Sequence, residues 1–202
     1  MKVLFLGGVF IKEMEKEILK NSKGVIQYAA NKFQYGIIDG LMTIEDITLD
    51  VLSAPFICPY PIEYKNLRIN NYSSVYRNKI NINSVGFNNL WGYRNISRTK
   101  SLKKVIKSFT EEKNENKIII IYSSHTPFLE AAIFAKKTDP TIHICLIVPD
   151  LPCFMNLNKK QSIVYKVFKK IDTSIFYNGL KYIDSFVLIT KQMKDQLGIG
   201  DR

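Results

Sequence analysis

The sequence has few of the residues that build metal sites and disulfide frameworks. Of its 202 residues only three are cysteine and two are histidine. Cys58, Cys145 and Cys153 are odd in number and follow no C-x-x-C spacing, so we expect reduced thiols in a cytoplasmic protein. His125 and His143 do not complete a zinc-ligand pattern with these cysteines, and we predict no protein-bound metal.

Long apolar runs are also missing. No stretch reaches the roughly 18 apolar residues that cross a bilayer. The opening MKVLFLGGVFI is short, breaks at Gly7-Gly8 and lacks a small-residue cleavage site, so we interpret it as a strand and not as a signal peptide. Any membrane contact is therefore expected to be peripheral, at the inner face of the membrane.

Acidic residues are too few to balance the basic ones. The chain has 29 Lys and Arg against 18 Asp and Glu, a net charge of +11. This balance favours an anionic partner, such as a phosphate-bearing ligand or an acidic membrane surface. The alternative is compositional drift that spreads lysines over a solvated surface. No block of Arg and Lys and no Gly-Arg repeat is present, so we predict no nucleic-acid partner.

The clearest pattern that is present lies between Lys117 and Asn156. Ile118 to Tyr122 and Ile142 to Val148 are continuous β-branched runs, typical of buried parallel strands. A helical pattern between them has basic residues in its last turn and stops at Asp139-Pro140. The segment therefore predicts one βαβ unit.

The remaining elements extend this unit to a larger sheet. We predict strands at Lys2 to Leu6, Ile47 to Ile57, Ile80 to Val85 and Asp184 to Thr190; helices from about Ser22 or Gly24, from Thr99 or Ser101 to Glu112, from Asn158 to Ile183 and from Lys191 to Leu197; and a long ordered loop from Pro59 to Lys79. Lys12 to Lys20 is interpreted as a charged insertion. The pattern predicts one doubly wound, Rossmann-like α/β domain over 1–202, with a parallel sheet of six to seven strands. Strand one is expected at its centre and Ile80 to Phe87 towards an edge.

Three helices have apolar positions that are expected to face the core. In the first these are Val25, Ile26, Ala29, Ala30, Phe33 and Ile37; in the second Leu102, Val105, Ile106 and Phe109; in the long helix Ile163, Val167, Phe168, Ile171, Ile175, Leu180 and Ile183. The long helix also has Lys159, Lys160, Lys166, Lys169 and Lys170. The alternative for that helix is contact with a membrane surface.

Candidate functional residues follow the strands, because ligands of open parallel sheets bind at the carboxyl ends of the strands. Gly7-Gly8-Val9-Phe10 could let backbone amides approach a phosphate or a sugar. The loop is not G-x-G-x-x-G and no Gly-Lys-Ser/Thr follows, so the dinucleotide and P-loop interpretations fail. A plain tight turn is the alternative.

Two further loops carry polar side chains. In Ser123-Ser124-His125-Thr126 a neutral imidazole could bind a sugar hydroxyl or act as a base. Alternatively Thr126-Pro127 is an N-cap followed by proline, with Glu130 close behind. In Pro149-Asp150-Leu151-Pro152 two prolines stiffen a loop that carries a carboxylate, which is either functional or a turn residue. No G-x-S-x-G elbow supports a Ser-His-Asp hydrolase.

These segments together resemble a known family. The Gly-Gly loop, HTPFLEAAIFAKK, ICLIVPDLP and a long helix leading to DSFVLIT resemble the amino-terminal half of family-4 glycosyltransferases with the GT-B architecture. In that family the first of two Rossmann-like domains mainly holds the acceptor, and the second holds the nucleotide sugar. The resemblance implies that 1–202 is the acceptor-side domain, with the donor-binding domain in cis beyond Arg202. The nucleotide sugar is then a co-substrate, and no resident cofactor is expected.

The resemblance also implies retaining transfer, with Asp150 as the catalytic residue of this half. The expected substrate-binding residues are Gly7, Gly8, Val9, Phe10, Ser124, His125, Thr126, Leu151 and Pro152. Many relatives have His-Asp where this chain has Pro149-Asp150, and the third glycine of their first loop is absent here. The rival hypothesis is a non-enzymatic, flavodoxin-like module that binds an anionic small molecule.

Overall fold

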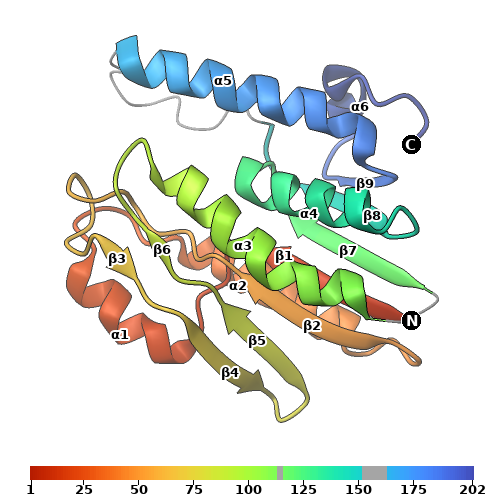
Figure 1. Ribbon diagram of the computed structural model, residues 1–202, viewed down its shortest axis with the longest axis horizontal. Helices are drawn as coiled ribbons and strands as arrows, with labels where there is room; N and C mark the ends of the chain where they lie inside the picture. Colours follow the sequence, from red (N-terminus) through yellow and green to blue (C-terminus); the bar gives the residue numbers. More distant parts are fainter. Residues whose placement is uncertain (113–115, 152–162) are drawn as a thin grey trace.

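The computed structural model of the protein describes residues 1–112, 116–151 and 163–202. These residues form an α/β fold in which a mostly parallel seven-stranded sheet lies between helical layers (Figure 1). Its strands, in spatial order, are β4 (Tyr72–Tyr76), β5 (Ile80–Ser84), β2 (Thr48–Ser53), β1 (Lys2–Gly7), β7 (Lys117–Tyr122), β8 (His143–Val148) and β9 (Ser185–Leu188). A separate antiparallel ribbon pairs β3 (Arg68–Ile69) with β6 (Phe87–Asn88). The predicted fold class is confirmed.

Six of the seven strands are parallel, and their order identifies the topology. Counted along the chain, they lie in the spatial order three, two, one, four, five, six, which is the Rossmann order. Strand β1 is central, as predicted, and Leu4 pairs with Asp50 of β2 on one side and Ile119 of β7 on the other. The chain therefore changes direction across the sheet between β1 and β7. The carboxyl ends of these two strands form the switch point, where ligands of such sheets bind.

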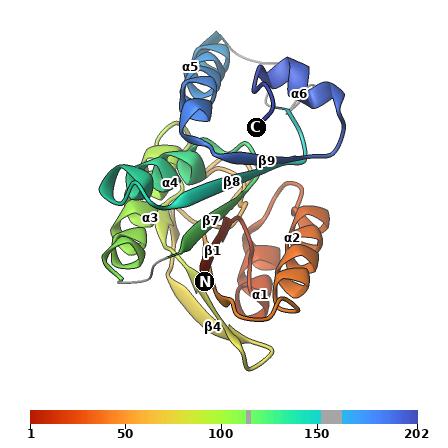
Figure 2. The same ribbon diagram turned by 90° about the vertical axis from the view of Figure 1, so that its right-hand side faces the viewer.

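Helices cover both faces of the sheet. One face carries α1 (Lys12–Asn21) and α2 (Tyr28–Leu41), and the other carries α3 (Arg94–Glu111) and α4 (Thr126–Thr138) (Figure 2). Helix α5 (Ile163–Gly179) packs on α4 and is followed by a 3₁₀ turn, Leu180–Tyr182, and after β9 by α6 (Gln192–Leu197). A methyl group at Gly179 would lie 2.6 Å from Leu129 Cδ2, so glycine lets α5 approach α4 closely.

The predicted βαβ unit is confirmed. Strands β7 and β8 are parallel, with Ile119 opposite Ile144 and Ile121 opposite Leu146, and α4 connects them. These side chains are buried, because helices cover both faces of a parallel sheet and its strands are correspondingly apolar throughout. The unit holds the loops after β7 and β8 at one edge of the molecule.

Two predictions for the first third of the chain were wrong. The charged segment from Lys12 to Lys20 is helix α1, whose Met14 and Ile18 are buried four positions apart. Helix α2 begins at Tyr28, and its buried positions are Gln34 and Ile38. The apolar positions expected to face the sheet, Val25 and Phe33 among them, are exposed or only partly buried.

The segment from Pro59 to Lys79 was wrongly expected to lack strands. It contains β3 and β4, and β4 pairs antiparallel with β5, from Tyr72 opposite Ser84 to Tyr76 opposite Ile80. Strand β4 therefore occupies the edge, and β5 is second from it. The alternating burial of β5 comes from solvent on one face and not from an edge position.

Two helices differ from the prediction in extent or in orientation. Helix α3 begins at Arg94, earlier than expected, and Val105 is partly exposed while Leu102, Ile106 and Phe109 are buried. In α5 the positions expected to be core are exposed instead: Ile163, Val167, Phe168, Ile171 and Ile175. Leu180 and Ile183 are buried as expected. The expected start of that helix at Asn158, with Lys159 and Lys160, lies outside the described residues.

Candidate functional site

Phe56 connects the loops that follow β1, β2 and β7 at the switch point. A Cβ atom at Gly8 would lie 2.4 Å from the Phe56 ring, so glycine is required for this contact. The Phe56 ring centroid lies 5.6 Å from that of His125 and 6.4 Å from that of Tyr122. The structure thus brings the predicted residues Gly8 and His125 to the same aromatic side chain.

The amides of the glycine loop already have acceptors within the chain. The Gly8 N–H donates to Oε1 of Gln34 at 2.8 Å, and the Phe10 N–H donates to Oδ1 of Asn31 at 2.9 Å. Val9 and Phe10 are buried. A phosphate bound by the Gly8 and Phe10 amides would have to displace two side chains of α2. This arrangement favours a loop that shapes the edge over one that holds phosphate.

The loop after β7 has a strained residue. Ser123 has a φ of +79°, a backbone conformation that residues other than glycine rarely adopt. Its hydroxyl is buried and has no hydrogen-bond partner among the residues that the structure describes. Strained backbone of this kind costs about 1–3 kcal/mol and clusters at functional sites. The next residue, Ser124, donates its hydroxyl to the Asp150 carbonyl at 3.2 Å, which ties this loop to the one after β8.

Arg98 controls the state of His125. Its side chain is only 1% exposed, and Nη2 donates to the Pro55 carbonyl at 2.8 Å. Nη1 lies 3.4 Å from Nε2 of His125. Because a guanidinium only donates, Nε2 is the acceptor of this long contact and the imidazole proton resides on Nδ1. Burial, and then the charges of Arg98 and Arg94, hold the pKa of His125 well below its usual range. His125 is therefore neutral.

The neutral imidazole has its acceptor nitrogen directed to Arg98. Of the two roles predicted for His125, this geometry favours donation from Nδ1 to a ligand over action as a base through Nε2. The ring also packs edge-on against Phe128, with centroids 4.9 Å apart. The packing and the Arg98 contact hold the ring in this position without a ligand.

Thr126 is not the N-cap of α4, contrary to prediction. The N-cap position is His125, and the Thr126 hydroxyl instead hydrogen-bonds to Asp172 of α5. Glu130 accepts a hydrogen bond from Thr99 of α3 at 3.0 Å and takes no part in a capping box. Burial raises the pKa of Asp172, and the nearby Glu130 carboxylate adds to this effect. These polar contacts join α3, α4 and α5 beside the loop of His125.

Asp150 lies exposed after β8, at the predicted edge. Burial raises the pKa of Tyr122, and the negative charge of Asp150 adds to this, which places the carboxylate near the phenol. Leu151 is buried. Pro152, the last predicted binding residue, lies outside the described residues.

Sequence reasoning missed Phe56, Arg94 and Arg98. Arg94 donates from Nη1 to the Ile57 carbonyl at 2.9 Å, and Arg98 donates to the same loop at Pro55. The two arginines thereby fix the loop that presents Phe56. Nothing in the spacing of a basic helix distinguishes a buried arginine from a solvated one. The three prolines that follow β2 were the only local signal that this loop is rigid.

No model of a known protein family matches the chain, and a search of the curated proteins finds no match. Within 1–112, 116–151 and 163–202, no group of three or more His, Cys, Asp or Glu is placed to hold a metal ion. No helix in the part of the chain that the structure describes is long and apolar enough to span a bilayer.

Proposed function

We propose that this chain is the acceptor-side domain of a retaining glycosyltransferase that uses a nucleotide sugar, with the donor-binding domain in cis. The observation that carries the proposal is the position of two loops. Gly7 to Phe10 and Ser123 to His125 flank the switch point of a sheet in the Rossmann order. The rival flavodoxin-like module has the order two, one, three, four, five, which differs from that of this sheet.

The state of the glycine loop supports a division of labour between two domains. The amides of Gly8 and Phe10 are bonded to Gln34 and Asn31, so this half offers few donors to a diphosphate. The nucleotide diphosphate is then held by the second domain. This half supplies the exposed Asp150 carboxylate, which accepts a hydrogen bond from an acceptor hydroxyl and orients it.

The experiment is a transfer assay on the protein encoded by the complete reading frame. We expect a second α/β domain after Arg202, and slow hydrolysis of one nucleotide sugar even without acceptor. Asp150→Asn should lower turnover with acceptor while leaving the urea midpoint unchanged, because an exposed loop carboxylate contributes little to stability. Full turnover by this variant would show that Asp150 is a turn residue with no role in transfer. A complete frame that stops shortly after Arg202 would favour the non-enzymatic module.

We further propose that α5 holds the protein at the inner face of an acidic membrane. Its exposed apolar positions include Ile163 (82% exposed), Val167 (53%) and Ile171 (51%). These residues recur at helical spacing, so they form a stripe on the outer side of α5, and Lys166 and Lys170 lie along its border. Each lysine near an anionic surface contributes about 1 kcal/mol. The net charge of +11 makes an acidic surface the matching partner.

Flotation with liposomes tests this contact. The protein should float with vesicles that contain phosphatidylserine at low salt, and less at high salt. Lys166→Glu with Lys170→Glu should weaken flotation, whereas the same charge change at Lys100 and Lys104 of α3 should weaken it less. Val167→Ser should also weaken it. Equal flotation with neutral vesicles, or equal loss in both double variants, would contradict the contact through α5.

A further inference from the structure

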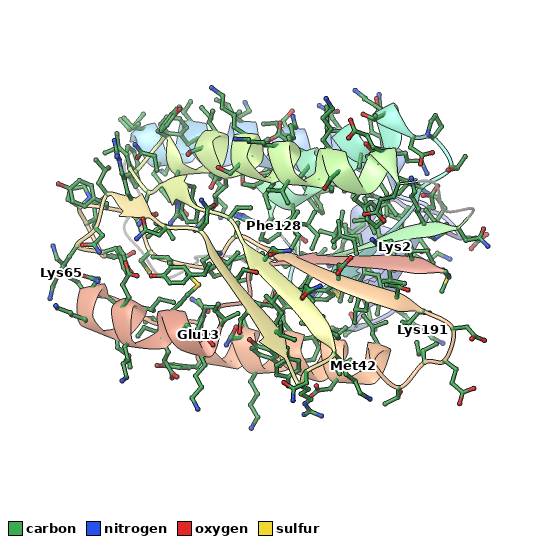
Figure 3. All side chains as sticks on the ribbon, turned by 60° about the horizontal axis from the view of Figure 1, so that its bottom comes forward. Lys2, Glu13, Met42, Lys65, Phe128 and Lys191 are labelled. Carbon is green, nitrogen blue, oxygen red and sulfur yellow. The ribbon has the colours of Figure 1, made fainter. Side chains whose placement is uncertain are left out.

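A groove of about 430 Å³ lies between α1, α2 and β4, on the face of the sheet opposite α3 and α4. Its size falls in the range of small-molecule sites, which is about 300–1,000 Å³. Figure 3 shows Glu13 on α1 close to β4, at one wall of the groove. Half of the lining side chains are aromatic or acidic: Phe10, Tyr28, Tyr35, Tyr76, Glu13 and Glu15.

The aromatic walls are held in place without a ligand. Phe10 and Tyr28 pack edge to face with ring centroids 5.6 Å apart, and Tyr35 and Tyr76 lie 4.9 Å apart. Asn31 fixes the backbone of Phe10 from both sides, because its Oδ1 accepts the Phe10 N–H at 2.9 Å and its Nδ2 donates to the Phe10 carbonyl at 3.3 Å. A groove fixed in this way needs little ordering when a ligand binds.

The carboxylates keep free acceptor capacity. Glu13 accepts one hydrogen bond from the Ser74 hydroxyl at 3.1 Å. Burial raises the pKa of Tyr28, and the negative charge of the nearby Glu15 carboxylate adds to this. A carboxylate offers about four lone pairs, so each can accept further hydrogen bonds from a ligand. Lys12 is the only basic residue among the described residues that line the groove. The groove is thus acidic in a strongly basic chain.

Tyr35, one of the lining tyrosines, lies near the carboxylates of Glu13 and Asp39. Burial raises the pKa of Tyr35 to about 12, with further contributions from Tyr76, Glu13 and Asp39. The nearby guanidinium of Arg77 lies 2.9 Å from the Asp39 carboxylate, so that cation is already paired. An anionic ligand would meet two carboxylates here and is disfavoured. A cationic ligand would meet the carboxylates and the faces of aromatic rings.

We propose that the groove between α1, α2 and β4 binds a small ligand that carries an ammonium group. Glu13 and Glu15 accept hydrogen bonds from the ammonium, and Tyr28 and Tyr35 contact its alkyl or ring carbons. An amino sugar and a linear polyamine share this chemistry. The inference rests on the groove alone and not on sugar transfer, so it can fail or hold independently of the proposed function.

Titration of the chain, followed by amide nitrogen–proton NMR, tests the inference. The probes are D-glucosamine, spermidine and N-acetyl-D-glucosamine, at a pH where the two amines are charged. At least one of the two amines should shift the amide signals of Tyr28, Tyr35 and Ser74. Comparison of the two shows whether the groove prefers an amino sugar or a linear polyamine. N-acetyl-D-glucosamine has the same ring without the charge and should shift them little. Equal shifts with the neutral sugar, or none with either amine, would overturn the inference.

Variants separate the groove from nonspecific charge effects. Glu15→Gln should weaken binding of the amine by about fivefold or more, since it removes one carboxylate charge and retains the shape. Glu111→Gln changes the net charge equally on α3 and should leave the affinity unchanged. Tyr28→Leu should also weaken binding by removing a ring face. Urea midpoints near that of the unmodified chain show that the variants fold. If all three variants bind the amine as tightly as the unmodified chain, the site is refuted.

Discussion

His125 should stay neutral at pH values where an ordinary histidine is protonated. Burial and the cations of Arg98 and Arg94 oppose a further positive charge on His125, so its folded pKa lies well below the unfolded value of about 6.5. Between these two values the unfolded chain binds more protons than the folded one. The free energy of unfolding is therefore unaffected by protonation of His125 above about pH 6.5. As the pH falls below this value, it decreases by up to about 1.4 kcal/mol per pH unit.

The matched variant is His125→Gln, which retains an acceptor for Arg98 and cannot titrate. Urea unfolding of both proteins from about pH 7 to pH 5 should show the unmodified chain losing stability relative to the variant by about 1 kcal/mol per unit below pH 6.5. Effects of carboxylates such as Asp139 and Asp184 are present in both proteins and cancel. Constant relative stability over this range would refute the argument.

Nitrogen NMR of the imidazoles gives a second, direct assay, because the chain has only two histidines. The His125 signal should show a proton on Nδ1 and no protonation near pH 6.5. The signal of His143, whose Nε2 lies 2.8 Å from the Ser185 hydroxyl, serves as the second resonance for assignment. A proton on Nε2 of His125, or protonation near pH 6.5, would refute the role assigned to Arg98.

The remaining predictions concern stability and are measured by urea unfolding followed by circular dichroism. Gly8→Ala should cost about 1–3 kcal/mol, because the new methyl group would lie 2.4 Å from the Phe56 ring. Gly36 lies in the middle of α2, and a Cβ atom there would have no neighbour within 4 Å, so Gly36→Ala should instead stabilise the fold by about 0.5–1 kcal/mol. If Gly8→Ala were the more stable of the two variants, the Phe56 contact would not be tight. Asp139→Asn should cost about 3 kcal/mol, because it leaves the Lys117 ammonium, with its side chain only 3% exposed, without its carboxylate at 3.0 Å. A cost below about 1 kcal/mol would mean that Lys117 reaches solvent.

The sheet could be predicted from the sequence because its central strands are apolar on both faces. Ile118 to Tyr122 and Ile142 to Val148 have no polar interruption, and helices of ordinary length cannot be fitted to such short runs. Strand β4 could not be found in the same way. It lies at the edge, and four of its five residues are polar or aromatic, which is also typical of an ordered loop.

The orientation of α2 was missed because a hydrogen bond, and not hydrophobicity, determines one of its buried positions. Gln34 is fully buried since its Oε1 accepts the Gly8 N–H, while the more apolar Phe33 is half-exposed. Helix α1 was missed because only a narrow apolar stripe, Met14 and Ile18, is buried in a segment of mostly charged residues. Periodicity of hydrophobic residues does not reveal contacts of this kind.

The position of the candidate site at the carboxyl ends of the strands could be predicted from the sequence, but its side-chain contacts could not. The switch-point rule located Gly8, His125 and Asp150 at the carboxyl ends of the strands, and the structure has them there. The side chains that fix this edge, Phe56 and Arg98, come from a loop and a helix with no distinctive spacing. Their roles depend on burial, which a basic helix pattern does not indicate.

Calorimetric titration with a panel of nucleotide sugars tests the central claim most directly, that this chain is the acceptor-side half of a glycosyltransferase. The 202-residue chain and the protein from the complete reading frame are titrated side by side. The account predicts binding of one nucleotide sugar by the longer protein and no tight binding by the chain alone, because the Gly8 and Phe10 amides are already bonded within it. Tight binding by the 202-residue chain would contradict the division of labour, and no binding by either protein would contradict the glycosyltransferase proposal itself.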